Sequence, residues 1–360
     1  MLKIAFLGAL ALIHLGCSST PKPAVEIKQA APPPADGLLL RARAGIGQGS
    51  LAALKEPFSE SHPVLLHIAT NRNNGGATPG ELVFGTTEVL VPHRHNVGVL
   101  DAGFQASGFK PQSLEDWKEG LLKNHDWGVL VFIHGFNIDF KEAMLRAAQI
   151  AYDLKFQGNV VLFSWPAGSE GGFLSKNLIN KVYERNQKNA RVSIEAARKF
   201  FAELATLPVP VQVMVHSMGH QVVVPALGTL SSSIDHPFIQ ELILNAPDID
   251  AAAFDLDAPK LSKIASRITL YCSQEDNALL ASKALNGTKR LGSCGLTRGV
   301  DVINVSEVDD PGLTGLGHSY YCSRPLLTDI LQVILGVPAE RRLFIRSAIP
   351  SGTENFVLRK

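Results

Sequence analysis

A serine at a sharp strand-to-helix turn is the residue best placed to do chemistry in this sequence. Ser217 follows the apolar run Val211–Val215 and precedes a second apolar run, of helical character, that begins after Gly219. A buried strand that turns at once into a buried helix leaves the residue at the turn with its side chain projecting away from the sheet. Gly219 has no Cβ to crowd such a turn. We therefore predict that Ser217 is a nucleophile, although Val215 replaces the first glycine of the usual G-x-S-x-G pattern.

A serine hydroxyl becomes a good nucleophile when a histidine takes its proton and a carboxylate holds that histidine in the right tautomer. In chains with this kind of elbow the order along the sequence is serine, acid, histidine. His318, in the stretch G-L-G-H-S-Y-Y, is the only histidine beyond His236 and is therefore the candidate base. Asp276 and Asp248 follow consecutive strand-like runs and compete as the acid. We favour Asp276 and interpret Asp248 and Asp250 as structural loop carboxylates.

A glycine turn follows another strand-like run. The motif H-G-F-N, at His134–Asn137, comes directly after the apolar residues Val129–Ile133. A glycine there lets the backbone turn so that amide N–H groups face a shared cavity, where each donor to an oxyanion contributes on the order of 3 kcal/mol. The predicted oxyanion-hole donors are the backbone N–H groups of Phe136 and of Met218, the residue after the serine. The alternative is an ordinary strand-to-helix turn with a structural glycine.

Two histidine pairs elsewhere in the chain invite a metal interpretation. H-R-H at His93–His95 and H-S-M-G-H at His216–His220 each place two histidines close together. Protein zinc sites take three or four ligands, and neither pair has a further ligand at a suitable spacing. The sequence therefore predicts neither a metal site nor a cofactor.

Strand-like and helical patterns alternate from Pro63 onward. Most of the strand-like runs are short, continuous and β-branched, as expected for strands covered on both faces. They are Val64–Ala69, Glu81–Phe84 with Glu88–Val91, Val129–Ile133, Val160–Ser164, Val211–Val215, Glu241–Leu244, Ile268–Cys272 and Val302–Val305. Helical patterns, clearest in Phe140–Phe156 and Asn189–Leu204, lie between them. We expect an α/β fold with a mostly parallel, eight-stranded sheet and helices on both faces.

The composition is that of a globular protein. Of the 360 residues 46% are hydrophobic, enough for a substantial core. Lys and Arg number 34 against 33 for Asp and Glu, and this net charge of +1 gives no basis for nucleic-acid binding. Residues 52–337 show no internal repeat and are predicted to form one domain. A proline- and alanine-rich tether, residues 18–51, precedes it. Residues 338–360 are a C-terminal tail, either a surface extension or a packed final segment.

The N-terminal residues have the pattern of a secretion signal. The apolar run Ile4–Ile13 follows a lysine and is too short to span a bilayer. With Gly16 and Cys17 at its end, the segment 1–17 resembles a bacterial lipoprotein signal, which implies that Cys17 becomes lipidated. An ordinary cleaved signal is the alternative. Ser18 after the cysteine implies the outer membrane, with the protein facing the periplasm.

Three cysteines remain if Cys17 is lipidated. Cys272, Cys294 and Cys322 permit one disulfide in an oxidising compartment and leave one thiol. Their spacing does not select a pair, and Cys272, at the end of a strand-like run, also suits a plain core residue.

A series of motifs runs in order through the chain. They are A-T-N-R (Ala69–Arg72), V-F-I-H-G-F-N (Val131–Asn137), F-S-W-P (Phe163–Pro166), H-S-M-G (His216–Gly219), L-N-A-P-D-I-D (Leu244–Asp250), Y-C-S-Q-E-D-N-A-L (Tyr271–Leu279), R-L-G (Arg290–Gly292) and G-H-S-Y-Y (Gly317–Tyr321). With them the chain resembles a group of bacterial α/β-hydrolases described as esterase/lipase superfamily enzymes of unknown substrate. The resemblance implies an α/β-hydrolase fold and the catalytic triad Ser217, Asp276 and His318. Residues 167–187 depart from the family pattern and are a candidate cap over the active site.

These observations predict a serine hydrolase that cleaves carboxylic esters, from small molecules or lipids, through an acyl-enzyme. A lipase or phospholipase acting on envelope lipids is the alternative among enzymes. A non-catalytic envelope lipoprotein that keeps the hydrolase fold is the alternative outside them, because function depends on the site rather than on the fold. The lipid anchor implied at Cys17 places the protein in the cell envelope.

Overall fold

The computed structural model describes residues 61–123, 127–169, 176–309, 318–348 and 355–359. The predicted signal, residues 1–17, and the predicted tether, residues 18–51, lie outside these ranges. The strands are β1 (Ser61–Arg72), β2 (Pro79–Pro92), β3 (Gln105–Ala106), β4 (Lys110–Gln112), β5 (Val129–Ile133), β6 (Asn159–Ser164), β7 (Val211–His216), β8 (Ile239–Asn245), β9 (Ala265–Cys272), β10 (Asp301–Asn304), β11 (Ile345–Ser347) and β12 (Phe356–Leu358).

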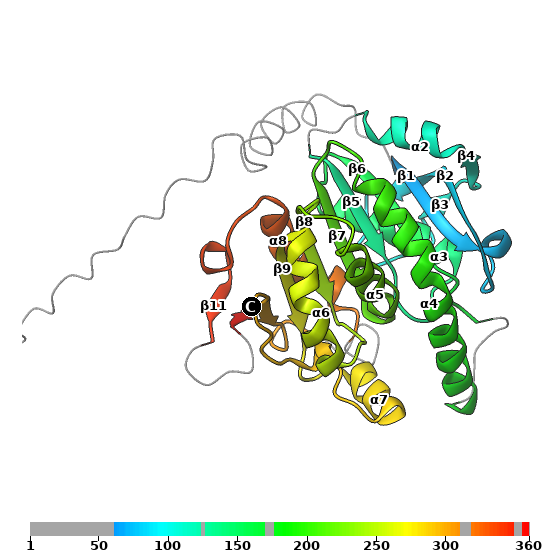
Figure 1. Cartoon of the computed structure of the whole chain (residues 1–360). Coiled ribbons are helices and arrows are strands. Elements are labelled where there is room, and N and C mark those ends of the chain that lie inside the picture. The colour runs from blue at the N-terminus through cyan, green and yellow to red at the C-terminus, as the bar shows by residue number, and fades with distance from the viewer. Residues whose placement is uncertain (1–60, 124–126, 170–175, 310–317, 349–354, 360) are drawn as a thin grey trace, which may run out of the picture. The chain divides into compact units, whose positions relative to one another are not determined.

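The strands of the described part of the chain form one twelve-stranded sheet (Figure 1). Its order is β11-β12-β10-β9-β8-β7-β5-β6-β1-β2-β3, with β4 also paired to β2. The central strands are parallel, whereas the β1–β2 pair at one side and the β11–β12 pair at the other are antiparallel. The expected α/β-hydrolase fold with a mostly parallel sheet is confirmed. All eight predicted runs form strands, but the predicted number of eight strands is too low. The additional strands are β3, β4, β11 and β12, whose two or three residues are too few to show a period in the sequence.

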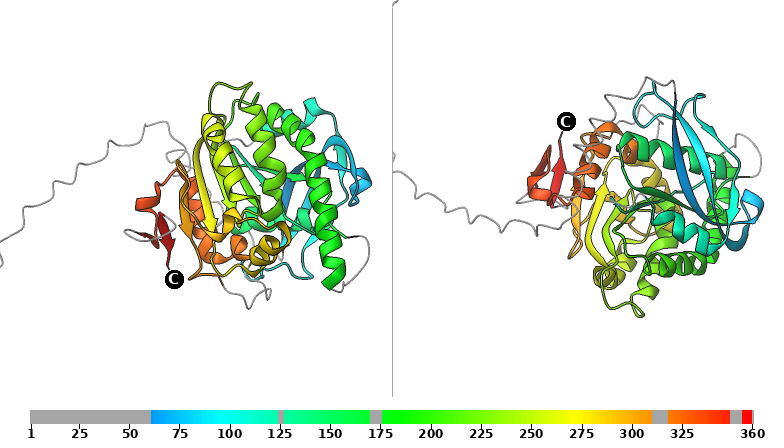
Figure 2. Two further views of the ribbon diagram at one scale, coloured as in Figure 1. Left: turned by 60° about the horizontal axis from the view of Figure 1, so that its bottom comes forward. Right: turned by 90° about the horizontal axis from the view of Figure 1, so that it is seen from above.

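Helices cover both faces of the sheet. They are α2 (Leu114–Leu121), α3 (Phe140–Asp153), α4 (Lys176–Leu204), α5 (His220–Leu230), α6 (Ala251–Ile264), α7 (Asn277–Asn286) and α8 (Arg324–Ile334). Residues of α2, α4, α5 and α6 belong to the apolar core on one face, and residues of α3 and α8 to the core on the other (Figure 2). Among the described residues, no helix has the length and apolar character needed to cross a lipid bilayer.

Alternate residues of each central strand point into opposite cores, which explains the continuous apolar runs. In β5, Val129, Val131 and Ile133 contribute to one core, while Leu130 and Phe132 contribute to the other. Every side chain of such a strand is removed from water, so each position favours an apolar residue. The pattern that predicted the strands is therefore a direct consequence of the double coverage.

Helix α4 begins well before the predicted stretch Asn189–Leu204. Its first half buries Tyr183, Asn186 and Asn189 as well as Val182. Because two of these buried residues are asparagines, this half shows no apolar period, and the sequence pattern therefore missed it. The predicted cap segment, residues 167–187, ends in this half-helix, and its residues 170–175 lie outside the described residues.

The C-terminal segment belongs to the sheet. Strand β12 pairs in parallel with β10 and antiparallel with β11, and this hairpin is drawn in red at one edge of the sheet (Figure 2). The buried Arg342 binds the buried Asp329 of α8 through an ion pair of 3.0 Å. The domain therefore continues to Leu358, beyond the predicted end at Val337. Strands of three residues are too short to show a period in the sequence.

One disulfide is present among the described residues. It joins Cys272, at the end of β9, to Cys294. Cys322 is a buried free thiol. The bond attaches the loop that carries Arg290 to the carboxyl end of a central strand.

Candidate active site

The strand-to-helix elbow forms as predicted. Ser217 follows β7, starts a short 3-10 turn that leads into α5, and has a left-handed φ of 52°. A residue other than glycine is strained in that backbone conformation, which persists only where the surrounding structure holds it. A Cβ on Gly219 would lie 2.6 Å from the carbonyl oxygen of His134, so only glycine fits there. His220 donates from Nδ1 to the Ser217 carbonyl at 2.7 Å and braces the turn.

Three side chains from distant segments form a hydrogen-bonded chain. The Nε2 atom of His318 lies 2.7 Å from Ser217 Oγ, and its Nδ1 lies 2.7 Å from Asp276 Oδ2. The other oxygen of Asp276 caps α7 by accepting the Leu279 N–H at 3.0 Å. With one oxygen held by a helix N-terminus, the buried carboxylate has a fixed direction and a favourable place for its charge.

The charge environment makes His318 a stronger base than an ordinary histidine. Burial lowers the pKa of His318, but the Asp276 carboxylate and its hydrogen bond oppose burial and prevail, with smaller contributions from Asp248 and Asp309. The pKa therefore lies above its usual value of 6.5. An imidazole whose protonated form is stabilised in this way can take the hydroxyl proton of Ser217.

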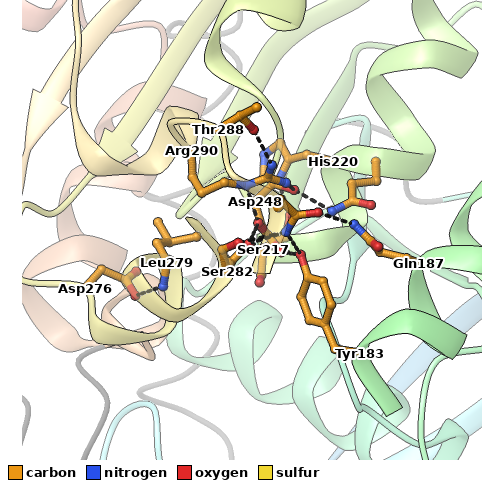
Figure 3. Close-up of polar contacts among 12 residues, drawn as sticks. Tyr183, Gln187, Ser217, His220, Asp248, Asp276, Leu279, Ser282, Thr288 and Arg290 are labelled. Carbon is orange, nitrogen blue, oxygen red and sulfur yellow. Dashed lines mark hydrogen bonds and ion pairs between the residues drawn. The ribbon is translucent and has the colours of Figure 1, made fainter. Parts of the chain in front are cut away.

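The competing acid, Asp248, is occupied elsewhere. Its Oδ1 accepts from Arg290 at 2.7 Å and from Ser282, and its Oδ2 accepts from the Tyr183 hydroxyl at 2.9 Å. Figure 3 shows this buried network beside Ser217, with Asp276 apart from it and next to Leu279. Asp248 also donates its backbone N–H to the Ser217 carbonyl at 3.3 Å. Both carboxylate oxygens of Asp248 are bound to these other residues, and its backbone N–H supports the elbow.

The turn His134–Asn137, which carries the predicted oxyanion donor Phe136 and is called the oxyanion turn below, lies against the elbow. A Cβ on Gly135 would come within 2.8 Å of the Ser217 Cβ, which shows how closely the two backbones approach. Asn137 has a left-handed φ of 55°, and its N–H donates to Asn186 of α4 at 3.1 Å. Among the described residues, the Phe136 N–H has no hydrogen-bond acceptor. Met218 lies in the first turn after β7, where N–H groups lack a helical partner.

The sequence matches a known family over more than half of its length. Residues 110–336 match a family described as "Alpha/beta hydrolase of unknown function (DUF900)". The chain belongs to this family. A solved structure described as the PEG-bound complex of a novel cold-adapted esterase from an Arctic intertidal metagenomic library matches at 13% identity and a TM-score of 0.35, covering 69% of this chain and 86% of that chain. No curated relative matches the sequence.

Sequence reasoning considered one histidine of this alpha/beta hydrolase only as a metal ligand and missed its contact with His318. His216 stacks on Tyr321, with ring centroids 3.7 Å apart, and donates from Nε2 to the His318 carbonyl at 3.3 Å. Burial first, then the neighbouring His318, hold the pKa of His216 well below its usual value, so its ring is neutral. His216 thus positions the backbone of the base. The motifs H-S-M-G and G-H-S-Y-Y contain both partners, but their contact appears only in the folded chain.

A third carboxylate of the hydrolase lies close enough to act on His318 through space. Asp309 is buried and accepts the Ser273 hydroxyl at 2.8 Å. Burial raises the pKa of Asp309 to about 6, with the negative Asp276 adding to the effect. No motif singled out this residue, because aspartates after a strand are common in loops.

Proposed function

We propose that this alpha/beta hydrolase is a serine hydrolase that cleaves carboxylic esters through an acyl-enzyme. The single observation that carries the proposal is the position of His318, whose two ring nitrogens each lie 2.7 Å from a partner, Ser217 on one side and Asp276 on the other. Such a chain activates a serine hydroxyl without a metal or cofactor. Ser217, Asp276 and His318 are the proposed catalytic residues, and no cofactor is required.

The proposed reaction has two halves. Ser217 Oγ attacks the acyl carbonyl while His318 Nε2 takes the hydroxyl proton, and Asp276 stabilises the imidazolium that forms. The N–H groups of Phe136 and Met218 donate to the oxyanion. His318 then gives its proton to the departing alcohol. Water, deprotonated by the same nitrogen, attacks the acyl-enzyme; the bond to Ser217 Oγ breaks, the proton passes from His318 to that oxygen, and the acid is released.

A fluorophosphonate probe tests the activated serine, because it labels serines whose proton is taken by a nearby base. We expect labelling of the wild type and none of Ser217→Ala or His318→Ala, with turnover of short-chain aryl esters lost in both. Ser231→Ala, at the C-cap of the helix that follows the elbow, and the exposed His236→Ala are the controls and should label normally. Absence of labelling in every form would favour the non-catalytic alternative.

We also propose that the protein is anchored in the cell envelope through a lipid on Cys17. The signal-like segment supports this proposal, and the Cys272–Cys294 disulfide suits an oxidising compartment. Metabolic labelling with an alkyne fatty acid should mark the full chain and not Cys17→Ser.

An anchored enzyme would meet lipid esters, so a rise in rate when a substrate passes from monomers to micelles would select the lipase alternative. A rate indifferent to aggregation would select small esters.

A further inference from the structure

Arg72, at the end of β1, is a buried arginine whose side chain is fully hydrogen-bonded. A guanidinium has five N–H donors in a fixed planar fork, and here each has an acceptor. The acceptors are Ser164 Oγ at 2.8 Å, the Ala167 carbonyl at 2.7 Å, the Gly76 carbonyl at 3.3 Å, the Ile138 carbonyl at 2.8 Å and His134 Nε2 at 3.2 Å. The fork therefore joins three loops at the carboxyl edge of the sheet.

Two of these acceptors bracket the oxyanion turn. His134 precedes the turn and Ile138 follows it, so one nitrogen of Arg72, Nη2, holds both ends of the loop that carries the Phe136 N–H. Burial, and then the charge of Arg72, hold the pKa of His134 well below its usual value. The neutral ring donates from Nδ1 to the Gly135 carbonyl at 3.1 Å, so Nε2 is an acceptor, shared by Arg72 at 3.2 Å and the Ser164 hydroxyl at 3.0 Å.

The same loop is fixed from its other side. The Trp165 indole donates to the His134 carbonyl at 2.9 Å and stacks on the His134 ring, with centroids 5.5 Å apart. Gly135 lies directly against Ser217, because a Cβ added to this glycine would be only 2.8 Å from the Cβ of the serine. A shift at His134 would therefore move the Phe136 N–H relative to the nucleophile.

The charge of Arg72 is not neutralised by a contact. Among the described residues no carboxylate lies within ion-pair distance of the guanidinium; its acceptors are carbonyls, a hydroxyl and a neutral imidazole. Burial lowers the pKa of Arg72 to about 9, and the more distant Asp139 opposes this effect. At neutral pH the group is thus a buried cation beside the turn where negative charge would develop.

We propose that Arg72 is a positioning residue for ester hydrolysis: it sets the oxyanion turn and adds a buried positive charge that favours the oxyanion. The inference rests on the proposed function, because it requires an oxyanion at Phe136 and Met218. Since these effects act on the transition state more than on the bound ester, Arg72 should govern kcat rather than KM.

Two substitutions separate the fork from the charge. Arg72→Met removes both and should lower kcat by about 30-fold or more, with KM changed by about threefold at most. Arg72→Lys keeps a charge but not the planar fork, and should fall between the wild type and Arg72→Met. A trifluoromethyl ketone that forms an oxyanion adduct with the serine should lose affinity in parallel with kcat.

Arg342→Met is the matched control, because Arg342 is also a buried arginine but binds Asp329 and Tyr271 near the C-terminus. It should lower the melting temperature while kcat per folded molecule stays near that of the wild type. The inference would be overturned if Arg72→Met and Arg342→Met had equal kcat. If Arg72→Met does not fold, equal kcat in Arg72→Lys and the wild type would overturn it. A wild type with neither turnover nor fluorophosphonate labelling would instead overturn the proposed function, and this inference with it.

Discussion

The Nδ1 atom of His318 lies 2.7 Å from the Asp276 carboxylate, although 42 positions separate the two residues in the chain. Asp276 is both the partner of the imidazole and the N-cap of α7. One residue thus joins a structural task to a proposed chemical one, and a substitution there affects both.

Replacing Asp276 by asparagine should reduce kcat by about 10,000-fold, because an amide cannot hold the imidazole in the tautomer that accepts the serine proton. The measurement is turnover of an aryl ester at saturating substrate. Asp250→Asn is the control, since Asp250 caps α6 through the Ala253 N–H in the same way and lies outside the hydrogen-bonded chain. Asparagine caps a helix about as well as aspartate, so both variants keep their caps, and equal loss of activity in the two would show that removing a charge at a helix N-terminus, rather than losing the acid of the chain, is the cause.

The activity should rise with pH through the pKa of His318. The neutral ring is the active base, and because the carboxylates around it raise its pKa above 6.5, the midpoint of the kcat/KM profile should lie above that pH. Asp309→Asn removes one of the raising charges and should move the midpoint towards lower pH. Asp250→Asn should leave it in place. A midpoint below 6.5 in the wild type would contradict this account of the site.

Loss of the Cys272–Cys294 disulfide should lower the free energy of unfolding by about 3 kcal/mol, as expected for a loop of 22 residues. Urea unfolding of Cys272→Ser/Cys294→Ser against the wild type measures this loss. A reductant should destabilise the wild type and leave the double variant unchanged. Equal sensitivity of both to reductant would show that the bond does not stabilise the fold.

Removing Arg290 should cost about 3–5 kcal/mol of stability, because Asp248 would then be a buried carboxylate without its cation. Urea unfolding of Arg290→Met gives the value. The double variant Asp248→Asn/Arg290→Met should lose less than the single one, since it no longer buries an unpaired charge. The exposed pair Arg198–Glu195 provides the comparison, and Arg198→Met should change stability little. A double variant less stable than Arg290→Met would overturn the pairing argument.

The elements that position the site could be predicted because their signals are local. The central strands are buried on both faces, so Val129–Ile133 and Val211–Val215 are continuous apolar runs. The elbow and the oxyanion turn need glycine where two backbones meet, and Gly219 and Gly135 therefore stand out in the sequence. Strands β11 and β12 could not be predicted, because three residues define no period and their pairing depends on β10.

The sequence by itself determined the order of the eight longer strands, the elbow serine and the candidate base, because each depends on a few adjacent residues. Only the tertiary structure decided which acid meets His318, which cysteines join, and that Arg72 holds both ends of the turn from His134 to Ile138. Asp276 and Asp248 follow neighbouring parallel strands and end at the same edge of the sheet, so sequence spacing cannot distinguish them. The difference comes from Arg290, Ser282 and Tyr183, which reach Asp248 from other segments and occupy both of its oxygens.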